Sequence, residues 1–424
     1  MNVGMMLMGA VDTIMVGRVS PEALAAVALG NVFSFAVMMF GVGILLALDP
    51  LLSQAHGAGE AEPFAIAVQR GVVLAGALAL PLSVAMLLAE PMLTLARQPA
   101  DVVPLVGTYC RILIVGVLPF LLFNVGRQTL QVLHRVGPVL WTILIANLAN
   151  VGLNQWLIHG GAGVPPMGVA GSAWATSISR LLMVGLLLGI SRHELLPLLR
   201  PLRPRLLTPA PFRAMLRIGL PIALQLEIEM AAFSIVALLM GTFGTVQVAG
   251  HQIALNLASL TFMVPMGVGM AASVQVGQAV GRGDPAAARA STRAALQLGG
   301  GFMVVTALLF LLLPTLIAGL YTNAAEVRTF AAVLLPIAGI FQVFDGVQVV
   351  CIGVLRGLGD THAPMLINLA GFGVLGVGTS LWLAYRTPLG PVGLWWGLVV
   401  GLLVVAVVLV LRVRVSLRRP LRRV

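Results

Sequence analysis

The chain is a succession of long apolar segments separated by short polar turns, many of which carry arginine. Most of these segments exceed the roughly 20 residues that an α-helix needs to cross the hydrocarbon core of a membrane. The pattern therefore predicts an all-α polytopic membrane protein with twelve transmembrane helices. The predicted spans cover residues 1–17, 23–50, 64–89, 103–126, 136–159, 168–191, 214–241, 246–278, 292–320, 328–355, 363–385 and 391–411.

A basic, proline-rich segment, RHELLPLLRPLRPRLLTPAPFR at residues 192–213, divides the predicted spans into two sets of six. We expect residues 1–191 to form an N-terminal six-helix lobe and residues 214–411 to form a C-terminal six-helix lobe. The segment between them is predicted to be a cytoplasmic linker that lies on anionic lipid headgroups. Residues 412–424 are predicted to be a basic cytoplasmic tail.

The two halves repeat each other at an offset of 222 to 226 residues. The matches are, in chain order, Gly17 with Gly241, Gly41–Gly43 with Gly267–Gly269, Gln54–Gly59 with Gln278–Gly283, Pro138 with Pro364, and the run from Gly168 with the run from Gly390. Because each half has an even number of spans, both copies keep the same orientation in the membrane. Parallel repeats about an axis along the membrane normal are typical of alternating-access transporters.

The repeat also indicates that the first helix is shortened. With Gly17 opposite Gly241, Met1 falls opposite Gln225, so the first span has no counterpart to residues 213–224. Seventeen residues form about 25 Å of helix, which is less than the roughly 30 Å of the hydrocarbon core. We expect a misassigned start or a truncated chain.

Composition and charge agree with a membrane protein and orient it. Hydrophobic residues make up 59% of the chain and charged residues 9%, which excludes an ordinary soluble protein. Cys110 and Cys351 both lie in apolar spans, which speaks against a disulfide framework or a metal site. All 25 basic residues are arginine, and alternating spans place 19 of them inside, 4 outside and 2 within spans. This bias predicts that both termini are cytoplasmic.

Two carboxylates lie deep in the predicted second lobe. Glu229 is twelve residues from both Arg217 and Gly241, and Asp345 is eleven residues before Arg356. An ionisable group at this depth is costly and is a functional candidate. No intramembrane lysine is available to neutralise the pair, so they can take up protons or bind cations such as Na⁺. The alternative is that neighbouring groups neutralise them and that they only order the bundle.

Glu227 is a further candidate, but it lies about 200° from Glu229 around the helix, so only one of the two easily faces a cavity. Asp345 is spaced by three from two glutamines that can line the same wall. Asn256 is a weaker candidate, near the start of the eighth span. The second-lobe candidates of lower rank are Glu227, Gln342, Gln348 and Asn256.

The first lobe offers one carboxylate and a row of amides. Asp12 lies in the outer half of the first span, about 9 Å from Arg18 along the helix. Asn147, Asn150 and Asn154 share one face of the fifth span, and two hydroxyl residues one turn apart, Ser172 and Thr176, can line the same cavity. These groups either form a proton or cation site with Asp12, or hold helices together by hydrogen bonds.

The chain resembles the multidrug and toxic compound extrusion (MATE) transporter family, and within it the NorM-like bacterial branch. The resemblance covers essentially the whole chain apart from the shortened start. The residues that carry it are VDTIMVG at 11–17, LSQAHGAG at 52–59, NVGLN at 150–154, the spacing of Glu229 and Phe233, AGHQIALN at 249–256, VGQAVGRGD at 276–284 and FQVFDGVQVVCIGVLRGLGDT at 341–361.

The resemblance implies a twelve-helix antiporter that exports mostly cationic, amphiphilic organic compounds in exchange for Na⁺ or H⁺. It makes Asp12 the carboxylate of the first lobe, with Asn150 and Asn154 beside it, and Glu229 and Asp345 the cation site of the second lobe. It implies a monomer in the bacterial inner membrane, with the bilayer and small organic cations as partners. No cofactor beyond the coupling ion and no nucleic acid are expected.

The sequence also allows other functions. A flippase for a lipid-linked precursor shares the two-lobe plan, but it would line its cavity with arginines, whereas the deep ionisable groups here are mainly acidic. A narrow-range metabolite exporter is a further alternative. An intramembrane enzyme would need a nucleophile and base or metal ligands, and the sequence has no HExxH or GxSxG motif. The sequence does not distinguish Na⁺ from H⁺ as the coupling ion.

Overall fold

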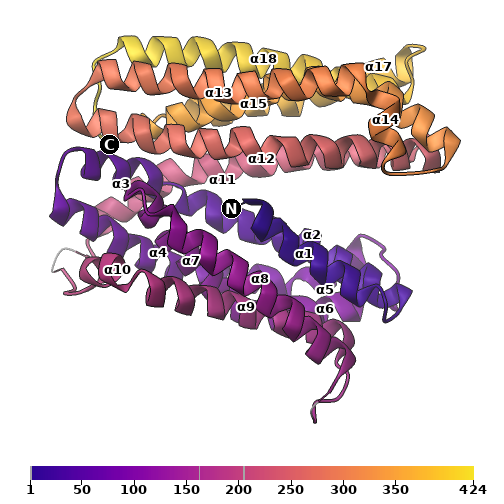
Figure 1. Cartoon of the computed structure of the whole chain (residues 1–424), viewed down its shortest axis with the longest axis horizontal. Helices are drawn as coiled ribbons and strands as arrows, with labels where there is room; N and C mark the ends of the chain where they lie inside the picture. Colours follow the sequence, from indigo (N-terminus) through magenta and orange to yellow (C-terminus); the bar gives the residue numbers. More distant parts are fainter. Residues whose placement is uncertain (1, 162, 204–205) are drawn as a thin grey trace. The chain divides into compact units, whose positions relative to one another are not determined.

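The computed structural model describes residues 2–161, 163–203 and 206–424. Within these residues the regular secondary structure is helical, apart from an isolated bridge between Gly161 and Val164 (Figure 1). The helices up to the basic segment are α1 (Asn2–Val16), α2 (Pro21–Leu45), α3 (Leu48–Gly57), α4 (Ala61–Leu87), α5 (Ala89–Leu95), α6 (Val103–Leu113), η1 (Ile114–Gly116), α7 (Val117–Val132), α8 (Val136–His159), α9 (Gly168–Ile190) and α10 (Arg192–Leu199).

The second half contains fewer but longer helices. They are α11 (Pro209–Gly241), α12 (Thr245–Arg282), α13 (Pro285–Leu312), α14 (Pro314–Gly319), α15 (Ala325–Gly357), α16 (His362–Asn368), the π-helical η2 (Leu369–Gly376), α17 (Val377–Arg386) and α18 (Pro391–Arg418).

Eleven helical segments of the described chain are long and apolar enough to cross a membrane. They correspond in order to the second to twelfth predicted spans. The remaining predicted span contains α1, which has 15 residues and is too short to be counted with the others. The prediction of an all-helical, multi-pass membrane protein is confirmed.

The turn between α12 and α13 illustrates how local sequence sets the helix ends. Gly283 ends α12 with φ of 66°, a left-handed conformation that glycine adopts without strain. Asp284 then accepts hydrogen bonds from the backbone N–H groups of Ala286 and Ala287, and Pro285 occupies the first position of α13. The sequence GDP therefore stops one helix and starts the next.

The chain divides into two compact units, of residues 1–48 with 61–219 and of residues 49–60 with 220–424. The short segment 49–60, which contains most of α3, thus belongs to the second unit. The segment 192–213 contains α10 and the start of α11. The predicted bounds of the lobes, linker and tail stay predictions.

Each unit has its own helix packing. In the first, α8 packs against α9 and α1, and α9 packs against α6 and α7. In the second, the long helices α12, α13, α15 and α18 pack side by side (Figure 1). The largest buried side chain of this second unit, Trp395 on α18, lies in its core with Phe341 of α15 and Phe372 of η2.

Two matching motifs of the repeat meet inside the second unit. A Cβ atom on Gly57 of α3 would lie 2.1 Å from the carbonyl oxygen of Gln278 on α12. A Cβ atom on Gly281 of α12 would likewise lie 2.1 Å from the carbonyl oxygen of Gln54 on α3. Gly57 matches Gly281 in the repeat, and Gln54 matches Gln278, so the two contacts are reciprocal. The two helices can approach this closely only because both positions are glycine.

Candidate functional site

Asp12 is the centre of a buried polar cluster in the first unit. Its carboxylate accepts a hydrogen bond of 2.6 Å from Nδ2 of Asn154 on α8 and one of 2.5 Å from Oγ1 of Thr176 on α9. All three side chains are buried. The structure thus brings together three residues that the sequence predicted to share a cavity, from three different helices.

The cluster has unused hydrogen-bonding capacity. Nδ2 of Asn154 also donates to Oδ1 of Asn150 at 3.1 Å. Nδ2 of Asn150, Oδ1 of Asn154 and Oγ of Ser172 are buried and have no partner among the described residues. Ser172 lies one turn before Thr176 on α9. Buried polar atoms are rarely left unpaired, so these atoms are suited to bind an ion, a water molecule or a substrate group.

Asn147 does not join this cluster, although it shares the face of Asn150. Its Nδ2 donates to the carbonyl oxygens of Gly4, at 2.9 Å, and Ile143, at 2.8 Å. Asn147 therefore ties the backbone of α1 to α8. This contact agrees with the alternative, that some amides of the row hold helices together.

Arg180 and Tyr109 also belong to the surroundings of Asp12, and neither was predicted as a site residue from the sequence. The charges of Asp12 and Arg180 interact, and the guanidinium of Arg180 lies 5.2 Å from the ring centre of Phe120. The hydroxyl of Tyr109 donates to Oδ1 of Asn31 at 2.8 Å. Arg180 follows Thr176 by one helical turn, and this spacing is the signal that could have identified it.

In the second unit, Asp345 on α15 and Glu229 on α11 are near enough for their charges to interact. Asp345 is buried and Glu229 is half-buried. Neither carboxyl forms a hydrogen bond or an ion pair with another described residue, and Oδ1 of Asp345 is buried without a partner. Two neighbouring carboxylates repel each other unless a proton or a cation is shared between them. The pair is therefore chemically suited to bind either.

The other second-unit candidates differ in their surroundings. Oε1 of Gln342 accepts a hydrogen bond of 2.6 Å from Thr261, while its Nε2 is buried without a described partner. Gln348 is buried, with Oε1 likewise unpaired among the described residues. Glu227 is half-buried and its Oε1 has no described partner. Asn256 is exposed on α12.

An aromatic cluster lies one turn from Glu229 and was not predicted. Phe233 on α11 contacts Phe341, with ring centres 5.8 Å apart, and Phe372, with ring centres 5.9 Å apart. Phe341 also contacts Trp395, whose Nε1 donates to Nδ1 of His251 at 3.1 Å. Phe341, Phe372 and Trp395 are fully buried in the core, so within this cluster only the half-buried Phe233 beside Glu229 can meet a cationic, partly apolar compound. Only the Glu229 to Phe233 spacing signalled this cluster in the sequence.

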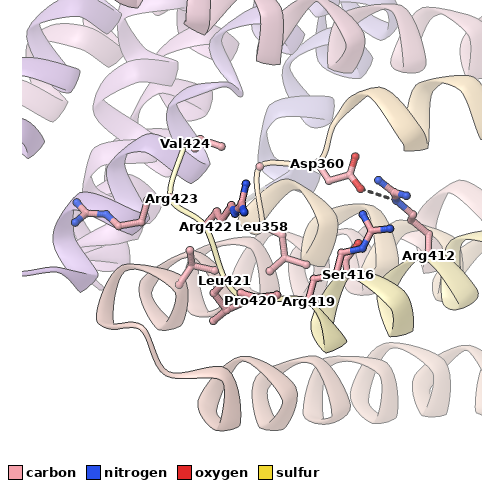
Figure 2. Close-up of a pocket in the computed structure, with 12 residues that line it drawn as sticks. Leu358, Asp360, Arg412, Ser416, Arg419, Pro420, Leu421, Arg422, Arg423 and Val424 are labelled. Carbon is pink, nitrogen blue, oxygen red and sulfur yellow. Dashed lines mark hydrogen bonds and ion pairs between the residues drawn. The ribbon is translucent and has the colours of Figure 1, made fainter.

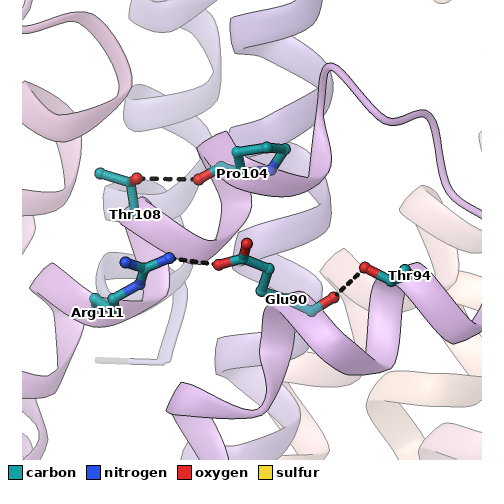
Figure 3. A network of polar contacts seen from close by, with 5 residues as sticks. All are labelled: Glu90, Thr94, Pro104, Thr108 and Arg111. Atoms are coloured by element: carbon teal, nitrogen blue, oxygen red, sulfur yellow. Dashed lines mark hydrogen bonds and ion pairs between the residues drawn. The ribbon is translucent and has the colours of Figure 1, made fainter.

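Arg111, the other arginine within a predicted span, lies outside both clusters. It pairs with Glu90 of α5, and both side chains are well exposed (Figure 3). The Glu90 side chain passes over Gly107 of α6, where a Cβ atom would lie 2.5 Å from Oε2 of Glu90. This exposed ion pair links α5 to α6 and contains no candidate ion-site residue.

The described residues contain no group of three or more His, Cys, Asp or Glu side chains that could hold a metal ion. The expectation that Glu229 and Asp345 bind Na⁺ rests on two carboxylates, with further oxygen ligands such as those of water or a carbonyl group. It stays a prediction.

Known proteins resemble the chain over nearly its full length. It is 39% identical over 420 residues to the multidrug resistance protein NorM of Burkholderia vietnamiensis, covering 96% of this chain and 89% of that protein. It is 37% identical over 421 residues to a probable multidrug resistance protein NorM of Rhizobium meliloti, with the same coverage.

Solved structures share the fold. A eukaryotic MATE transporter matches with a TM-score of 0.87 at 23% identity, covering 98% of this chain and 94% of that one. A MATE in the bent conformation matches with a TM-score of 0.89 at 20% identity, covering 98% and 92%. The MatE family pattern matches residues 1–156 and 221–382. The predicted resemblance is confirmed, and the chain belongs to the MatE family.

Proposed function

We propose that the protein is a secondary active antiporter that exports organic, mostly cationic and amphiphilic compounds in exchange for Na⁺ or H⁺. The observation that carries the proposal is the pair Glu229 and Asp345, two interacting carboxyls without a hydrogen-bonded or ion-paired partner among the described residues. Relatives at 37% to 39% identity are named multidrug resistance proteins, which supports drug-like compounds as the exported class. As a member of a transporter family, the chain is not an enzyme.

In the second lobe, the pair of Glu229 and Asp345 binds the coupling cation in one part of the transport cycle and releases it in another. When the pair is empty, its negative charge attracts an organic cation, and the half-buried ring of Phe233 contacts the apolar part of that compound. When Na⁺ or H⁺ binds, the charge is neutralised and the organic cation is released. Gln342 and Gln348 lie on α15, the helix of Asp345, and supply uncharged polar groups.

In the first lobe, Asp12 is the second coupling group. Asn154 and Thr176 fix its carboxylate by hydrogen bonds, Asn150 accepts a hydrogen bond from Asn154, and Ser172 offers a further oxygen. Occupation of Asp12 changes the charge among α1, α8 and α9, which is a means of linking ion binding to helix movement.

The arginine bias favours a bacterial inner-membrane protein with both termini cytoplasmic. Residues 1–191 and 214–411 then form the two lobes that rock against each other, joined by the linker 192–213 and followed by the tail 412–424. The proposed unit of transport is a monomer, because each chain carries both carboxylate sites.

Ethidium accumulation in efflux-deficient bacteria tests the proposal. Cells that produce the wild-type chain should hold less dye than cells without it, and Glu229→Gln and Asp345→Asn should abolish the difference at equal protein levels. Glu227→Gln is the matched control, because it makes the same change of side chain two residues before Glu229. This variant should leave export intact.

Two results would contradict the proposal. If the wild-type protein lowers neither ethidium nor other organic cations, a precursor flippase or a narrow metabolite exporter becomes the better account. If the Glu227 variant fails while the Glu229 variant works, the assignment of the second-lobe carboxylate is wrong.

A further inference from the structure

A cavity whose lining contains none of the candidate ion-site residues lies where the C-terminal tail folds back on the second unit. Its volume is about 590 Å³, and its walls come from the end of α18, the tail after it, and the turn between α15 and α16 (Figure 2). No step of the proposed transport cycle involves this cavity.

Four arginines line the cavity, against one acid, Asp360. Arg412 is paired with Asp360 at 2.7 Å, and Arg423 with Glu60 of the α3–α4 turn. The side chains of Arg419 and Arg422 are exposed and form no hydrogen bond or ion pair with a described residue. Once the paired charges cancel, these two guanidinium groups remain against the terminal carboxylate of Val424, which also belongs to the lining, so the cavity keeps a net positive charge.

The tail that carries these arginines is fixed by direct contacts. The backbone N–H of Val424 donates to Oε1 of Gln54 at 2.9 Å, and Nε2 of Gln54 donates to the carbonyl oxygen of Gly357 at 3.0 Å. A Cβ atom on Gly359, which has φ of 80°, would lie 2.3 Å from Cγ1 of Val424. The tail backbone is thus anchored at Val424 as well as by its connection to α18. This anchoring holds the arginines over the cavity and lowers the entropic cost of binding a ligand there.

The cavity is also partly apolar and lies at the ends of membrane spans. Val280, Leu358, Pro420 and Leu421 belong to its lining. The spans that contain α12, α15 and α18 end at Arg282, Gly357 and Arg418, within a few residues of it. The ends of membrane spans lie at the depth of the lipid headgroups. Basic pockets at this depth bind anionic lipid headgroups.

We propose that this cavity binds the phosphate-bearing headgroup of an anionic phospholipid. Arg419 and Arg422 donate hydrogen bonds to the phosphate oxygens, since guanidinium groups bind phosphate in a bidentate manner. The apolar lining contacts the glycerol backbone and the first carbons of the acyl chains. This site goes beyond the proposed function and does not depend on the ion or the compound that is transported.

Binding of short-chain phosphatidylglycerol to the purified full-length chain in a neutral detergent tests the proposal, with calorimetry as the readout. Short-chain phosphatidylcholine and inorganic phosphate are the comparison ligands. We expect saturable binding of phosphatidylglycerol and none of phosphatidylcholine. Arg419→Ala with Arg422→Ala should weaken binding by about thirtyfold, because each basic group near an anionic lipid contributes roughly a factor of five.

The pair Arg414→Ala with Arg418→Ala is the matched control. Both residues are exposed on the same helix end and outside the lining, so the change in net charge is equal. Equal weakening by the two pairs would show attraction to a basic surface, not a site, and would overturn the proposal. Saturable binding of inorganic phosphate without a preference for phosphatidylglycerol would overturn the lipid as the occupant. Thermal unfolding of both variants checks that they are folded.

Discussion

Asp12 and Asp345 are both buried carboxyls, but only one has hydrogen-bond donors. Asn154 and Thr176 donate to Asp12, whereas no described residue donates to Asp345. Donors stabilise a charged carboxylate, and their absence leaves the carboxyl dependent on a proton or a cation. We therefore propose that Asp12 is a preorganised ion site, whereas Asp345 requires its partner Glu229 and a bound ion.

Thr176→Val tests the preorganisation of Asp12. The variant keeps the shape of the side chain and removes one donor to the carboxylate, so ion-driven export should fall by about tenfold or more, since a hydrogen bond to a charged group contributes about 1.5–3 kcal/mol. Initial rates of ethidium efflux against the concentration of the coupling ion provide the measurement.

Ser179→Ala is the control for that experiment. Its hydroxyl is buried on the same helix but bonds to the carbonyl of Ala175, one turn away, and should have little effect on export. Export at the wild-type rate in Thr176→Val would contradict a role for the Asp12 cluster.

Helical spacing predicted part of this site and missed the rest. It placed Asn150 and Asn154 on one face and Ser172 one turn before Thr176, and in the structure Asn154 and Thr176 bond to Asp12 while Asn150 bonds to Asn154. It also placed Asn147 on that face, yet Asn147 bonds to the backbone of Gly4. Spacing fixes which residues share a face but not what lies opposite each turn of it, and only the packing of helices decides that.

At the scale of the elements, the contact between α3 and the end of α12 depends on glycine. Gly281→Ala should destabilise the protein by about 1–3 kcal/mol, because the added methyl group meets the backbone of Gln54, which cannot move away as a flexible side chain could. The midpoint of thermal unfolding in detergent is the measurement.

Gly267→Ala is the matched control on the same helix. Its Cβ atom would meet nothing within 4 Å, and alanine favours the helix over glycine. This variant should unfold at the same or a slightly higher temperature. If the two variants behave alike, the close approach of the repeat motifs is not a source of stability.

The tail contact of Glu60 with Arg423 should depend on pH. The hydrogen bonds from Arg423 hold the pKa of Glu60 below its ordinary value of 4.5. A carboxylate whose pKa is lowered in the folded state stabilises that state at a pH above its ordinary pKa. This stabilisation is lost as the pH falls through the lowered pKa. The tail should therefore be fixed at neutral pH and released only below about pH 4.5.

A spin label on Ser416→Cys with Arg422→Cys can follow that release by the distance between the labels. Both native cysteines are buried, so labelling is selective. We expect an unchanged distance from pH 8 to pH 5 and a broader distribution in more acidic solution. The added substitution Glu60→Gln should give the broad distribution at every pH, and a narrow one at neutral pH would contradict the contact.

The sequence predicted that the membrane-spanning segments are helical, but it did not predict where those helices are interrupted. The predicted span 23–50 is broken between α2 and α3, and the span 363–385 contains the π-helical η2. In η2, Gly371 and Gly376 lie against Gly401 of α18, so the irregularity coincides with a close contact between two helices. Hydropathy records how apolar a segment is, and it contains no information on such contacts.

The internal repeat predicted how the whole molecule is organised, whereas hydropathy predicted only its membrane-spanning segments. It predicted two copies of one plan, and the reciprocal contacts of Gly57 and Gly281 agree with such a repeat. It did not predict that segment 49–60 would belong to the second compact unit. That placement depends on contacts between α3 and α12, which are distant in the sequence.

We propose that export of an organic cation and entry of an ion are one coupled process. In proteoliposomes that contain the purified protein, an imposed ethidium gradient should drive Na⁺ or H⁺ in the opposite direction, without any initial ion gradient. Glu229→Gln and Asp345→Asn should abolish the ion movement. Ethidium movement that carries neither ion in exchange, or ion movement that survives both substitutions, would contradict the account.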